Sequence, residues 1–349
     1  MSIHGNPSYR WKSFFGLSAK KSGFIRSRLN IIQGMQVHTQ GYRPDFYCAF
    51  PFNFSNSHGA VIGFALLESR RRLRHYQRAR ILRPAHDRIN AAKGERGMAH
   101  YLAARVISVE PLKSYVRLTL EAPSIAAEMR PGQFVMVSAS PEAFLARPFS
   151  IAHVDGDRIS IVFQAVGCGT DWLVALRPGN TTKVLGPLGN GFCLGDGDHP
   201  VIVAGGRGIA PFYDLVRRIS HLSPVLFYGG RTKEQIVEPE YFERFCDRLV
   251  ITTEDGSAGR QGFLTDPLAD YLQKNTPPVI YGCGPHAMLH RVAELADGIR
   301  TEFSMEARMA CGFGICIGCV IPAGESGYRR VCIDGPIFGA KDIRWKDLT

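Results

Sequence analysis

Four cysteines crowded into one glycine-rich segment constrain this chain more than any other feature of its sequence. The chain has 349 residues and nine cysteines, and four of the nine fall within one stretch of 22 residues. These four are Cys311, Cys316, Cys319 and Cys332. Clustered cysteines in a chain this long, without a convincing secretion signal, are typical of metal ligands in a reducing compartment rather than of a disulfide framework. The segment therefore predicts a metal centre in a cytoplasmic protein.

The spacing of these cysteines indicates which metal centre to expect. A C-x4-C-x2-C run followed by a distal cysteine is the ligand order of plant-type [2Fe-2S] sites, although the last gap here is only 12 residues. Glycines at 312, 314 and 318 would let the backbone wrap closely and aim N–H groups at the sulfurs. The alternative is a zinc site, which usually shows two C-x2-C pairs, whereas this segment has one. The spacing favours an iron-sulfur cluster over zinc.

The basic charge of the chain is confined to its first 97 residues. That segment holds 17 Lys and Arg against 4 Asp and Glu, and the totals of 42 and 31 leave 25 against 27 for the rest. The remainder therefore gives no nucleic-acid signal. Residues 1–97 show no sustained period of 2 or 3.6. Three interpretations stay open for them: a transit peptide, a basic tethering arm, or an extension upstream of a native start at Met98. We expect a basic extension that is disordered or not native.

No part of the sequence predicts a membrane span. The longest early apolar run, residues 60–67, is far shorter than the roughly 20 residues that a spanning helix needs.

The hydrophobic pattern beyond Met98 divides the chain into three parts. Residues 98–197 contain six short β-rich runs separated by Gly, Pro and Asp turns, which predicts an antiparallel barrel or sandwich. Residues 198–300 alternate buried strands with helices, which predicts a parallel sheet with a ligand at the carboxyl ends of its strands. In the first of these helices, Phe212, Leu215, Val216 and Ile219 share one face. Residues 301–349 hold the cysteines and a short tail.

Two short motifs in the barrel half suit a phosphate group. Arg147 opens the run RPFS at the start of an expected strand, where it can fork onto a pyrophosphate while Ser150 reaches a polar ring edge. The alternative is an ordinary surface arginine. Gly169 and Thr170 belong to the turn GCGT, whose amides and hydroxyl suit phosphate oxygens. A helix expected over residues 171–176 would place that anion at its N-terminus.

Two further glycine turns follow strands of the second half. GGRGIAP, with Gly206, Gly208 and Pro211, lies between an expected strand and an expected helix, as a dinucleotide motif requires. Pro211 replaces the third glycine of G-x-G-x-x-G, so the motif is incomplete. The turn around Cys283 ends another strand and points at the same ligand region, although this thiol could equally be a small buried hydrophobe.

Taken in order, the motifs resemble one family. RPFS, GCGT, GPLGNGF, GGRGIAP, EDGSAGRQGFLTD, YGCGP and the cysteine segment resemble the ferredoxin reductase superfamily. Within it they are most similar to the electron-transfer subunits of NAD-linked, type B dihydroorotate dehydrogenases. The resemblance covers residues 98–340 and leaves out residues 1–97. Arg207 departs from the pattern, because such proteins commonly carry a small or aliphatic residue there.

The resemblance implies an α+β multidomain, ferredoxin-reductase-like fold. An antiparallel FAD-binding β-barrel (98–197) would precede an α/β parallel-sheet, NAD-binding-like domain (198–300), and a small [2Fe-2S] subdomain with the tail (301–349) would follow. The four cysteines would ligate the cluster. The residues implied for FAD and the nicotinamide nucleotide are Arg147, Pro148, Phe149, Ser150, Val162, Phe163, Gln164, Gly169, Thr170, Gly206, Gly208, Pro211 and Cys283.

The resemblance also implies a function and a partner. An FMN-containing dihydroorotate dehydrogenase catalytic subunit would oxidise dihydroorotate, and this chain would relay the electrons to NAD, in a heterotetramer. The sequence shows no residues for the pyrimidine chemistry itself. Two alternatives stay open: a reductase subunit of a hydrogenase or ferredoxin:NADP reductase complex, and a zinc-stabilised interaction protein. NAD versus NADP, and the direction of electron flow, are not decided by the sequence.

Overall fold

The computed structural model of the chain describes residues 98–140, 145–195 and 197–348. The expectations for residues 1–97 lie outside these ranges. Among the helices that are described, none is long and apolar enough to cross a membrane.

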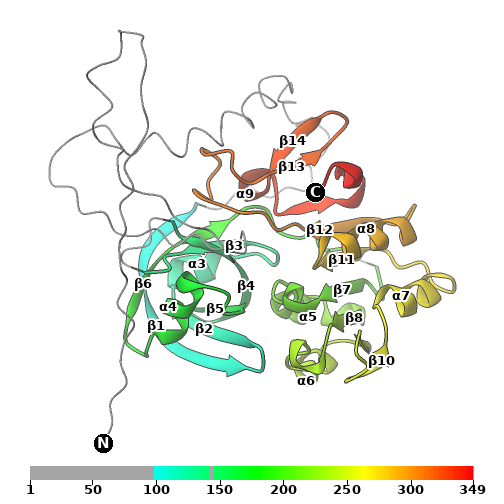
Figure 1. Ribbon diagram of the computed structural model, residues 1–349, viewed down its shortest axis with the longest axis horizontal. Coiled ribbons are helices and arrows are strands. Elements are labelled where there is room, and N and C mark those ends of the chain that lie inside the picture. The colour runs from blue at the N-terminus through cyan, green and yellow to red at the C-terminus, as the bar shows by residue number, and fades with distance from the viewer. Residues whose placement is uncertain (1–97, 141–144, 196, 349) are drawn as a thin grey trace, which may run out of the picture. The chain divides into compact units, whose positions relative to one another are not determined.

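The first half is a closed antiparallel barrel, as the sequence predicts (Figure 1). Its six strands lie in the order β1-β2-β5-β4-β3-β6. Their bounds are β1 (His100–Leu112), β2 (Tyr115–Glu121), β3 (Phe134–Val137), β4 (Arg147–Asp155), β5 (Arg158–Phe163) and β6 (Thr181–Leu188). Two short helices accompany them, α3 (Pro123–Glu128) and α4 (Cys168–Ala175). The sequence patterns indicate the six strands but not α3.

The barrel closes because alternate side chains of each strand fill its interior. Leu118 and Leu120, two positions apart on β2, are completely buried, as are Ile159 and Ile161 on β5. Register shifts in β1, and in β4 between Ile151 and the residue two further on, provide the local irregularity that lets strands of a small barrel curve. The motif RPFS thus starts a strand of a rigid, closed sheet.

The second half is a seven-stranded sheet in the order β10-β9-β8-β7-β11-β12-β15. Its strands are β7 (Val201–Gly205), β8 (Val225–Gly230), β9 (Arg248–Thr253), β10 (Arg260–Gln261), β11 (Ile280–Cys283), β12 (Thr301–Ser304) and β15 (Ile337–Gly339). All neighbours pair in parallel except β12 and β15. The connecting helices are η1 (Gly206–Ile209), α5 (Phe212–Arg218), η2 (Ser220–Leu222), η3 (Lys233–Gln235), α6 (Pro239–Glu243), α7 (Thr265–Leu272) and α8 (His286–Leu295).

The strand order locates the ligand-binding edge of this sheet. From β7 the chain runs outward through β8, β9 and β10, and then returns to place β11 and β12 on the other side of β7. Such a reversal is the topological switch point, where open α/β sheets bind ligands at the carboxyl ends of their strands. The turns after β7 and β11 lie at this point. The face expected for the first helix is also observed, because Phe212, Leu215 and Val216 of α5 are completely buried.

The segment between β12 and β15, residues 305–336, is called the cluster segment below. It contains the hairpin of β13 (Val320–Ala323) and β14 (Gly327–Arg330) and the short helix α9 (Val331–Asp334). The tail, with η4 (Ala340–Asp342) and η5 (Trp345–Asp347), packs back on both parts. Arg344 donates to the carbonyl of Gly327 at 2.7 Å, and the Trp345 ring stacks on His290 of α8 with centroids 5.4 Å apart. The cluster segment is therefore anchored in the sheet at both ends.

Candidate functional site

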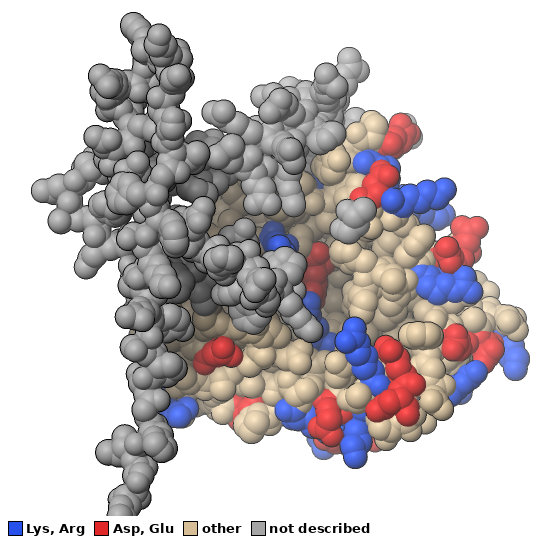
Figure 2. Space-filling model, viewed as in Figure 1, with Lys and Arg blue, Asp and Glu red and all other residues tan. Residues whose placement is uncertain are grey.

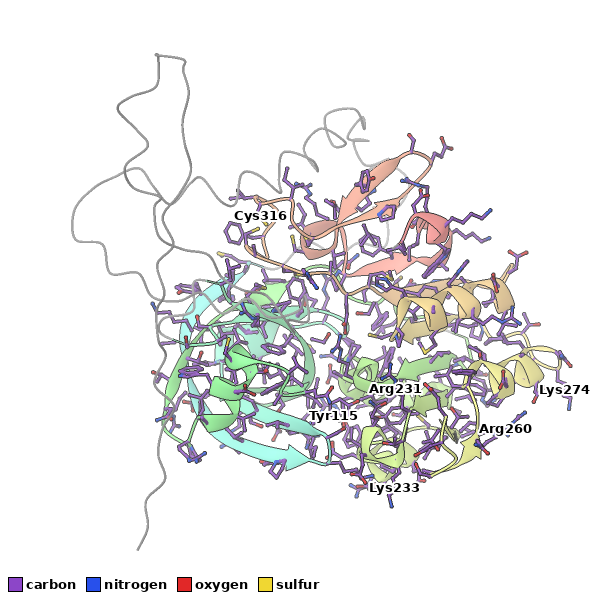
Figure 3. The ribbon with its side chains drawn as sticks, in the orientation of Figure 1. Tyr115, Arg231, Lys233, Arg260, Lys274 and Cys316 are labelled. Carbon is purple, nitrogen blue, oxygen red and sulfur yellow. The ribbon has the colours of Figure 1, made fainter. Side chains whose placement is uncertain are left out.

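The four clustered cysteines lie together in two pairs. The Cys311 sulfur accepts from the Cys316 N–H at 3.5 Å, and the Cys319 sulfur accepts from the Cys332 N–H at 3.5 Å. The thiols within each pair also interact with each other. Cys316 is exposed at the edge of the segment (Figure 3), and its own sulfur accepts from the Gly318 N–H at 3.4 Å.

These hydrogen bonds favour a thiolate in each pair, at Cys311 and at Cys319. The pKa of Cys319 falls to about 6, because the Cys332 thiol and then backbone N–H groups donate to its sulfur. Burial raises the pKa of Cys311, but hydrogen bonds from nearby N–H groups, those of Cys316 and Phe313 first, and from the Cys316 thiol outweigh burial together, and its pKa falls to about 7. The pKa of Cys332 is raised, since its proton is held by Cys319. Anionic sulfur is the form that binds iron or zinc.

The pairing distinguishes the two metal centres considered from the sequence. A zinc site needs four ligands about one ion, whereas a [2Fe-2S] cluster shares four thiolates between two irons. Two pairs of cysteines therefore fit the cluster.

The glycines of the cluster segment have different roles. Gly312 and Gly314 have φ of +78° and +90°, so both adopt the left-handed backbone expected of glycine beside a cluster. Gly318 does not have a positive φ; the left-handed residue next to it is Ile317, at +56°. A Cβ on Gly318 would lie 3.5 Å from the Cys316 sulfur, so glycine there leaves room beside a ligand.

On the barrel, the structure brings RPFS and GCGT together. The turn of residues 166–170, called the α4 turn below, precedes and opens α4, which begins at Cys168 rather than at the expected residue 171. A Cβ on Gly169 would lie 3.4 Å from Nε of Arg147, so the guanidinium sits directly beside this glycine. Arg147 also donates to the Leu145 carbonyl at 2.9 Å, which fixes its direction. A cation and a helix N-terminus meet here, which suits a diphosphate.

Thr170 shapes this turn instead of pointing away from it. Its hydroxyl accepts from the N–H groups of Val166 at 2.8 Å and Gly167 at 3.1 Å, and donates to the Gly167 carbonyl at 2.8 Å. The hydroxyl therefore acts as a cap, a use that the sequence pattern did not suggest. The helix α4 begins in this turn, and a helix N-terminus suits an anion.

The strands beside the α4 turn carry the other residues expected on the barrel. Arg147, Pro148, Phe149 and Ser150 are all half-buried along β4, and the Phe149 and Phe163 rings lie 5.2 Å apart. Val162 and Phe163 are buried on β5, and Gln164 follows at partial exposure. A half-exposed strand surface on an otherwise filled barrel suits a flat ring, so these residues fit a flavin.

The cluster segment packs on this same part of the barrel. A Cβ on Gly312 would lie 2.5 Å from Cγ of Met136 on β3. Met136 is the register partner of Pro148 on β4. The loop that carries the first cysteine therefore touches the strand next to RPFS.

The two glycine turns at the switch point are pressed against each other. A Cβ on Gly208 would lie 2.3 Å from the Cys283 carbonyl oxygen, so only glycine fits there. Gly206 has φ of +53°, and Pro211 is the N-cap of α5, one residue before the first helical position. Cys283 is fully buried, and burial raises the pKa of its thiol. This thiol has the surroundings of a small buried side chain at the ligand-binding edge.

Sequence patterns missed the contacts that join the barrel to the sheet. In the turn between β1 and β2, Lys113 donates to the Ile236 carbonyl at 2.6 Å, and Ser114 donates to that of Glu234 at 2.7 Å. Arg117 of β2 pairs with Glu238, which also accepts from the Tyr213 hydroxyl at 2.7 Å. The contacts of Lys113, Ser114 and Arg117 each join positions about 120 residues apart, and no local sequence pattern indicates them.

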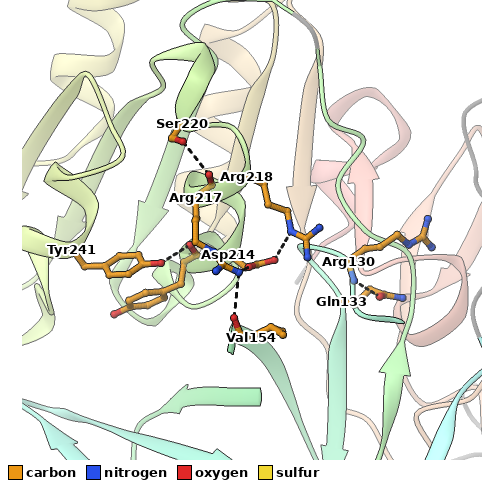
Figure 4. Close-up of polar contacts among 9 residues, drawn as sticks. Arg130, Gln133, Val154, Asp214, Arg217, Arg218, Ser220 and Tyr241 are labelled. Atoms are coloured by element: carbon orange, nitrogen blue, oxygen red, sulfur yellow. Dashed lines mark hydrogen bonds and ion pairs between the residues drawn. The ribbon is translucent and has the colours of Figure 1, made fainter. Parts of the chain in front are cut away.

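A buried carboxylate completes this junction (Figure 4). Asp214 of α5 is fully buried and pairs with Arg217 and Arg218, each at 2.6 Å. Arg217 also donates to the Val154 carbonyl on β4 at 3.2 Å. The two guanidinium groups neutralise the Asp214 carboxylate, whose burial would otherwise be costly. The junction holds β4 at a fixed position relative to α5.

Charged side chains are mixed on the face that Figure 2 shows. Over the described residues of that face, Lys and Arg alternate with Asp and Glu and form no broad basic surface. This agrees with the balanced charge of the chain beyond residue 97.

Family models match two parts of the chain. Residues 202–294 match the oxidoreductase NAD-binding domain, and residues 306–344 match the iron-sulfur cluster binding domain of dihydroorotate dehydrogenase B. The second match spans all four clustered cysteines.

Individual relatives agree with these matches. The chain is 34% identical over 248 residues to a dihydroorotate dehydrogenase B (NAD(+)) electron transfer subunit of Caldanaerobacter subterraneus subsp. tengcongensis, covering 69% of this chain and 98% of the relative. It is 38% identical to the same subunit of Bacillus caldolyticus, over 65% of this chain and 91% of that one. Among solved structures, an NADH-dependent reduced ferredoxin-NADP oxidoreductase aligns with a TM-score of 0.65 and 25% identity, covering 73% of this chain and 93% of that chain.

Proposed function

Since this chain belongs to the family of dihydroorotate dehydrogenase B electron transfer subunits, we propose a path by which it passes electrons between NAD(H) and a catalytic partner. It is an oxidoreductase subunit of the NAD-linked dihydroorotate dehydrogenase complex, and it uses FAD, a [2Fe-2S] cluster and NAD(H). When bound, the flavin exchanges electron pairs with the nicotinamide and single electrons with the cluster.

One observation carries the proposed path. The cluster segment touches Met136, and Met136 is paired in register with Pro148 of RPFS. A flavin on β4 and a cluster on Cys311 would therefore be neighbours across a single strand. The contacts of Lys113 and Ser114 with the chain around η3, and of Arg217 of α5 with β4, join the barrel to the sheet. The path that follows runs from the nicotinamide to the flavin, then to the cluster and the partner.

We assign the residues as follows. Arg147 and the amides of Gly169 and Thr170 bind the FAD diphosphate, which is anionic and suits a cation beside a helix N-terminus. Pro148 to Ser150 and Val162 to Gln164 line the flavin. Gly206, Gly208, Pro211 and Cys283 border the nicotinamide nucleotide. The cysteines at 311, 316, 319 and 332 ligate the cluster. We further propose residues 98–197 as the FAD-binding domain, 198–300 as the nucleotide-binding domain and 301–349 as the cluster domain. The cluster domain contributes β12 and β15 to the sheet.

The partner meets the chain at the exposed edge of the cluster segment. The side chains of Phe313 and Ile315 are 50% and 76% exposed, on either side of the left-handed Gly314, and Cys316 is exposed beside them. Apolar side chains next to a redox centre suit a dry contact with another protein. We propose an FMN-containing catalytic subunit there, in a heterotetramer of two copies of each chain. A cytoplasmic location, expected from the clustered thiols, stays a prediction.

The test uses purified protein with its cofactors. We expect stoichiometric FAD, two irons per chain, and bleaching of both chromophores by NADH without oxygen. Mixed with a dihydroorotate dehydrogenase B catalytic subunit, the protein should give dihydroorotate-dependent reduction of NAD and a native mass of four chains. Absence of flavin or iron would overturn the cofactor assignment, whereas a native mass of two chains would overturn only the tetramer.

The likeness to ferredoxin-NADP oxidoreductase supports a second candidate, a reductase subunit of another complex. The same preparation separates the two. Transfer to ferredoxin with no response to the dihydroorotate-oxidising subunit would favour the second candidate.

A further inference from the structure

An ion pair spans the carboxyl end of β11. Arg207 belongs to η1, directly after β7, and Glu306 comes two residues after β12. Both strands are parallel neighbours of β11, so the two side chains approach from opposite sides of the Cys283 turn. Nη2 of Arg207 lies 3.3 Å from Oε2 of Glu306.

The pair stands at the place where a dinucleotide would bind. The switch point lies between β7 and β11, and the tight contact of Gly208 with the Cys283 carbonyl brings the two glycine turns together there. Arg207 is also close to the barrel, since its charge acts on Tyr115, which lies where barrel and sheet meet (Figure 3). Both charges act on the buried Cys283 thiol, Glu306 raising its pKa and Arg207 lowering it, although burial has the largest effect.

The ion pair of Arg207 and Glu306 is exposed, so Arg207 can exchange Glu306 for another anion. The Arg207 and Glu306 side chains are 58% and 52% exposed, and ion pairs in such surroundings contribute little to stability. A diphosphate carries more negative charge than one carboxylate and offers oxygens that a guanidinium can grip in a fork. Glu306 would repel the same diphosphate.

We propose that Arg207 positions the nicotinamide nucleotide, exchanging its partner Glu306 for a phosphate of the nucleotide when the nucleotide binds. This proposal rests on the proposed function, because it requires that NAD(H) bind at the switch point. Glu306 then acts as a competitor for Arg207, and the strength of nucleotide binding is the balance between the two.

The test measures equilibrium binding of ADP-ribose to the oxidised holoprotein by calorimetry. ADP-ribose carries the diphosphate and no nicotinamide, so no electron transfer interferes. We expect Arg207→Met to weaken binding by roughly tenfold, as loss of a charge-assisted contact does. Glu306→Gln should tighten binding by about two- to fivefold, and this gain should shrink when Arg207 is also replaced. Binding to the Arg207→Met protein should also depend less on salt.

Lys274→Met is the matched control. It removes one positive charge two residues after α7, far from Tyr115 in Figure 3, and should leave binding unchanged. FAD and iron content confirm that each variant is folded, and Arg207→Lys replaces Arg207→Met if the latter loses flavin. The Arg207→Lys protein should then bind ADP-ribose more weakly than the wild type, since lysine lacks the forked pair of donors of a guanidinium.

Two outcomes would overturn the proposal: unchanged binding in the Arg207 variant, or weaker binding in Glu306→Gln. Each differs from failure of the proposed function, in which the wild-type protein itself would bind no ADP-ribose and NADH would not reduce its flavin.

Discussion

The cluster segment and the α4 turn use glycine for different purposes. In the cluster segment, Gly312 and Gly314 adopt left-handed backbone, and three sulfurs accept hydrogen bonds from N–H groups. In the α4 turn, Gly169 does not have a positive φ; it leaves space, since a Cβ would lie 2.9 Å from the Cβ of Ala139 and close to Arg147. One site is therefore shaped by its own backbone and the other by a side chain from a separate strand. Loss of a cysteine in the first should be all-or-none, and changes in the second should be graded.

The largest expected effect is that of Cys316→Ser. A serine hydroxyl does not replace a thiolate, so the iron-sulfur absorbance and electron delivery to the partner should be lost. FAD should stay bound, because the α4 turn lies on the barrel. Iron and FAD per chain are the measurements.

Cys193→Ser is the control for this prediction. Cys193 is a partly exposed free thiol outside the cluster segment, and its replacement should leave iron unchanged. Wild-type iron content in Cys316→Ser would contradict the ligand assignment. Loss of FAD together with iron would show that the two sites are not independent.

A large but incomplete effect is expected of Gly314→Ala. Its φ of +90° costs an L-residue about 1 to 2 kcal/mol, which is a roughly five- to thirtyfold shift in an equilibrium. The Cβ would also lie 2.6 Å from Cδ1 of Ile333 and 3.1 Å from its Cγ2, so this branched side chain would have to shift as well. The rate of cluster loss to an iron chelator should therefore rise.

Gly318→Ala tests whether backbone conformation, rather than the added methyl group itself, destabilises the cluster segment. Gly318 lacks a positive φ, and its Cβ would make ordinary contact with the Cys316 sulfur at 3.5 Å. It should lose its cluster more slowly than Gly314→Ala. Equal rates would mean that backbone conformation does not set the stability of this segment.

The contrast between the two regions also explains what the sequence could predict. Gly312, Gly314 and three of the four cysteines lie within residues 311–319, so their spacing alone indicated the cluster. Arg147 and Gly169 are 22 positions apart and meet only because β4, β5 and α4 fold back on one another. RPFS and GCGT were therefore weak signals singly, and before the resemblance to a family only their shared fit to phosphate oxygens linked them.

The elements of the fold were predicted more completely than their connections. Alternation indicated the six barrel strands, and the apolar face of α5 was correct at Phe212 and Leu215. The addition of β15 to the sheet was not foreseen, because Ile337 and Phe338 are too short a run to signal a strand. The Arg207 pair with Glu306 joins residues 99 positions apart, and nothing local marks it.

A graded effect is expected of Arg147→Ala. The guanidinium would make charge-assisted contacts to the FAD diphosphate, each contributing roughly 1.5 to 3 kcal/mol, so FAD affinity should fall by roughly tenfold or more. Iron content should not change. Fluorescence of released FAD after gel filtration at low protein concentration measures the loss.

Arg147→Lys refines this prediction. It keeps the charge but not the fork, and should retain FAD better than Arg147→Ala and worse than the wild type. Unchanged FAD retention in both variants would contradict the role given to Arg147, and complete loss of FAD in both would remove the contrast with the cluster segment.

The smallest expected effect concerns pH and His153, which lies on β4 six positions beyond Arg147. Burial lowers the pKa of His153, and the charges of Arg217 and Arg117 lower it further, while Asp214 and Asp155 oppose them. The ring lies edge-on to Tyr241 of α6 at 6.1 Å, and its Nδ1 is buried without a hydrogen-bond partner in the described structure. The folded chain therefore holds this histidine neutral at pH values where an unfolded chain, with a pKa of about 6.5, begins to take up a proton.

The sign of the effect follows from this difference. The stabilising contribution is complete above pH about 6.5 and is lost as the pH falls through the lower pKa of the folded state. The temperature at which heating releases FAD should thus drop between pH 7.5 and 5.5 in the wild type. His153→Gln, which cannot take up that proton, should show a smaller drop, whereas the rate of cluster loss should change equally with pH in both proteins. An identical drop in the temperature of FAD release in both proteins would mean that the junction between β4 and α5 does not respond to His153. A difference between the two proteins in the rate of cluster loss alone would reverse the distinction drawn between the two sites.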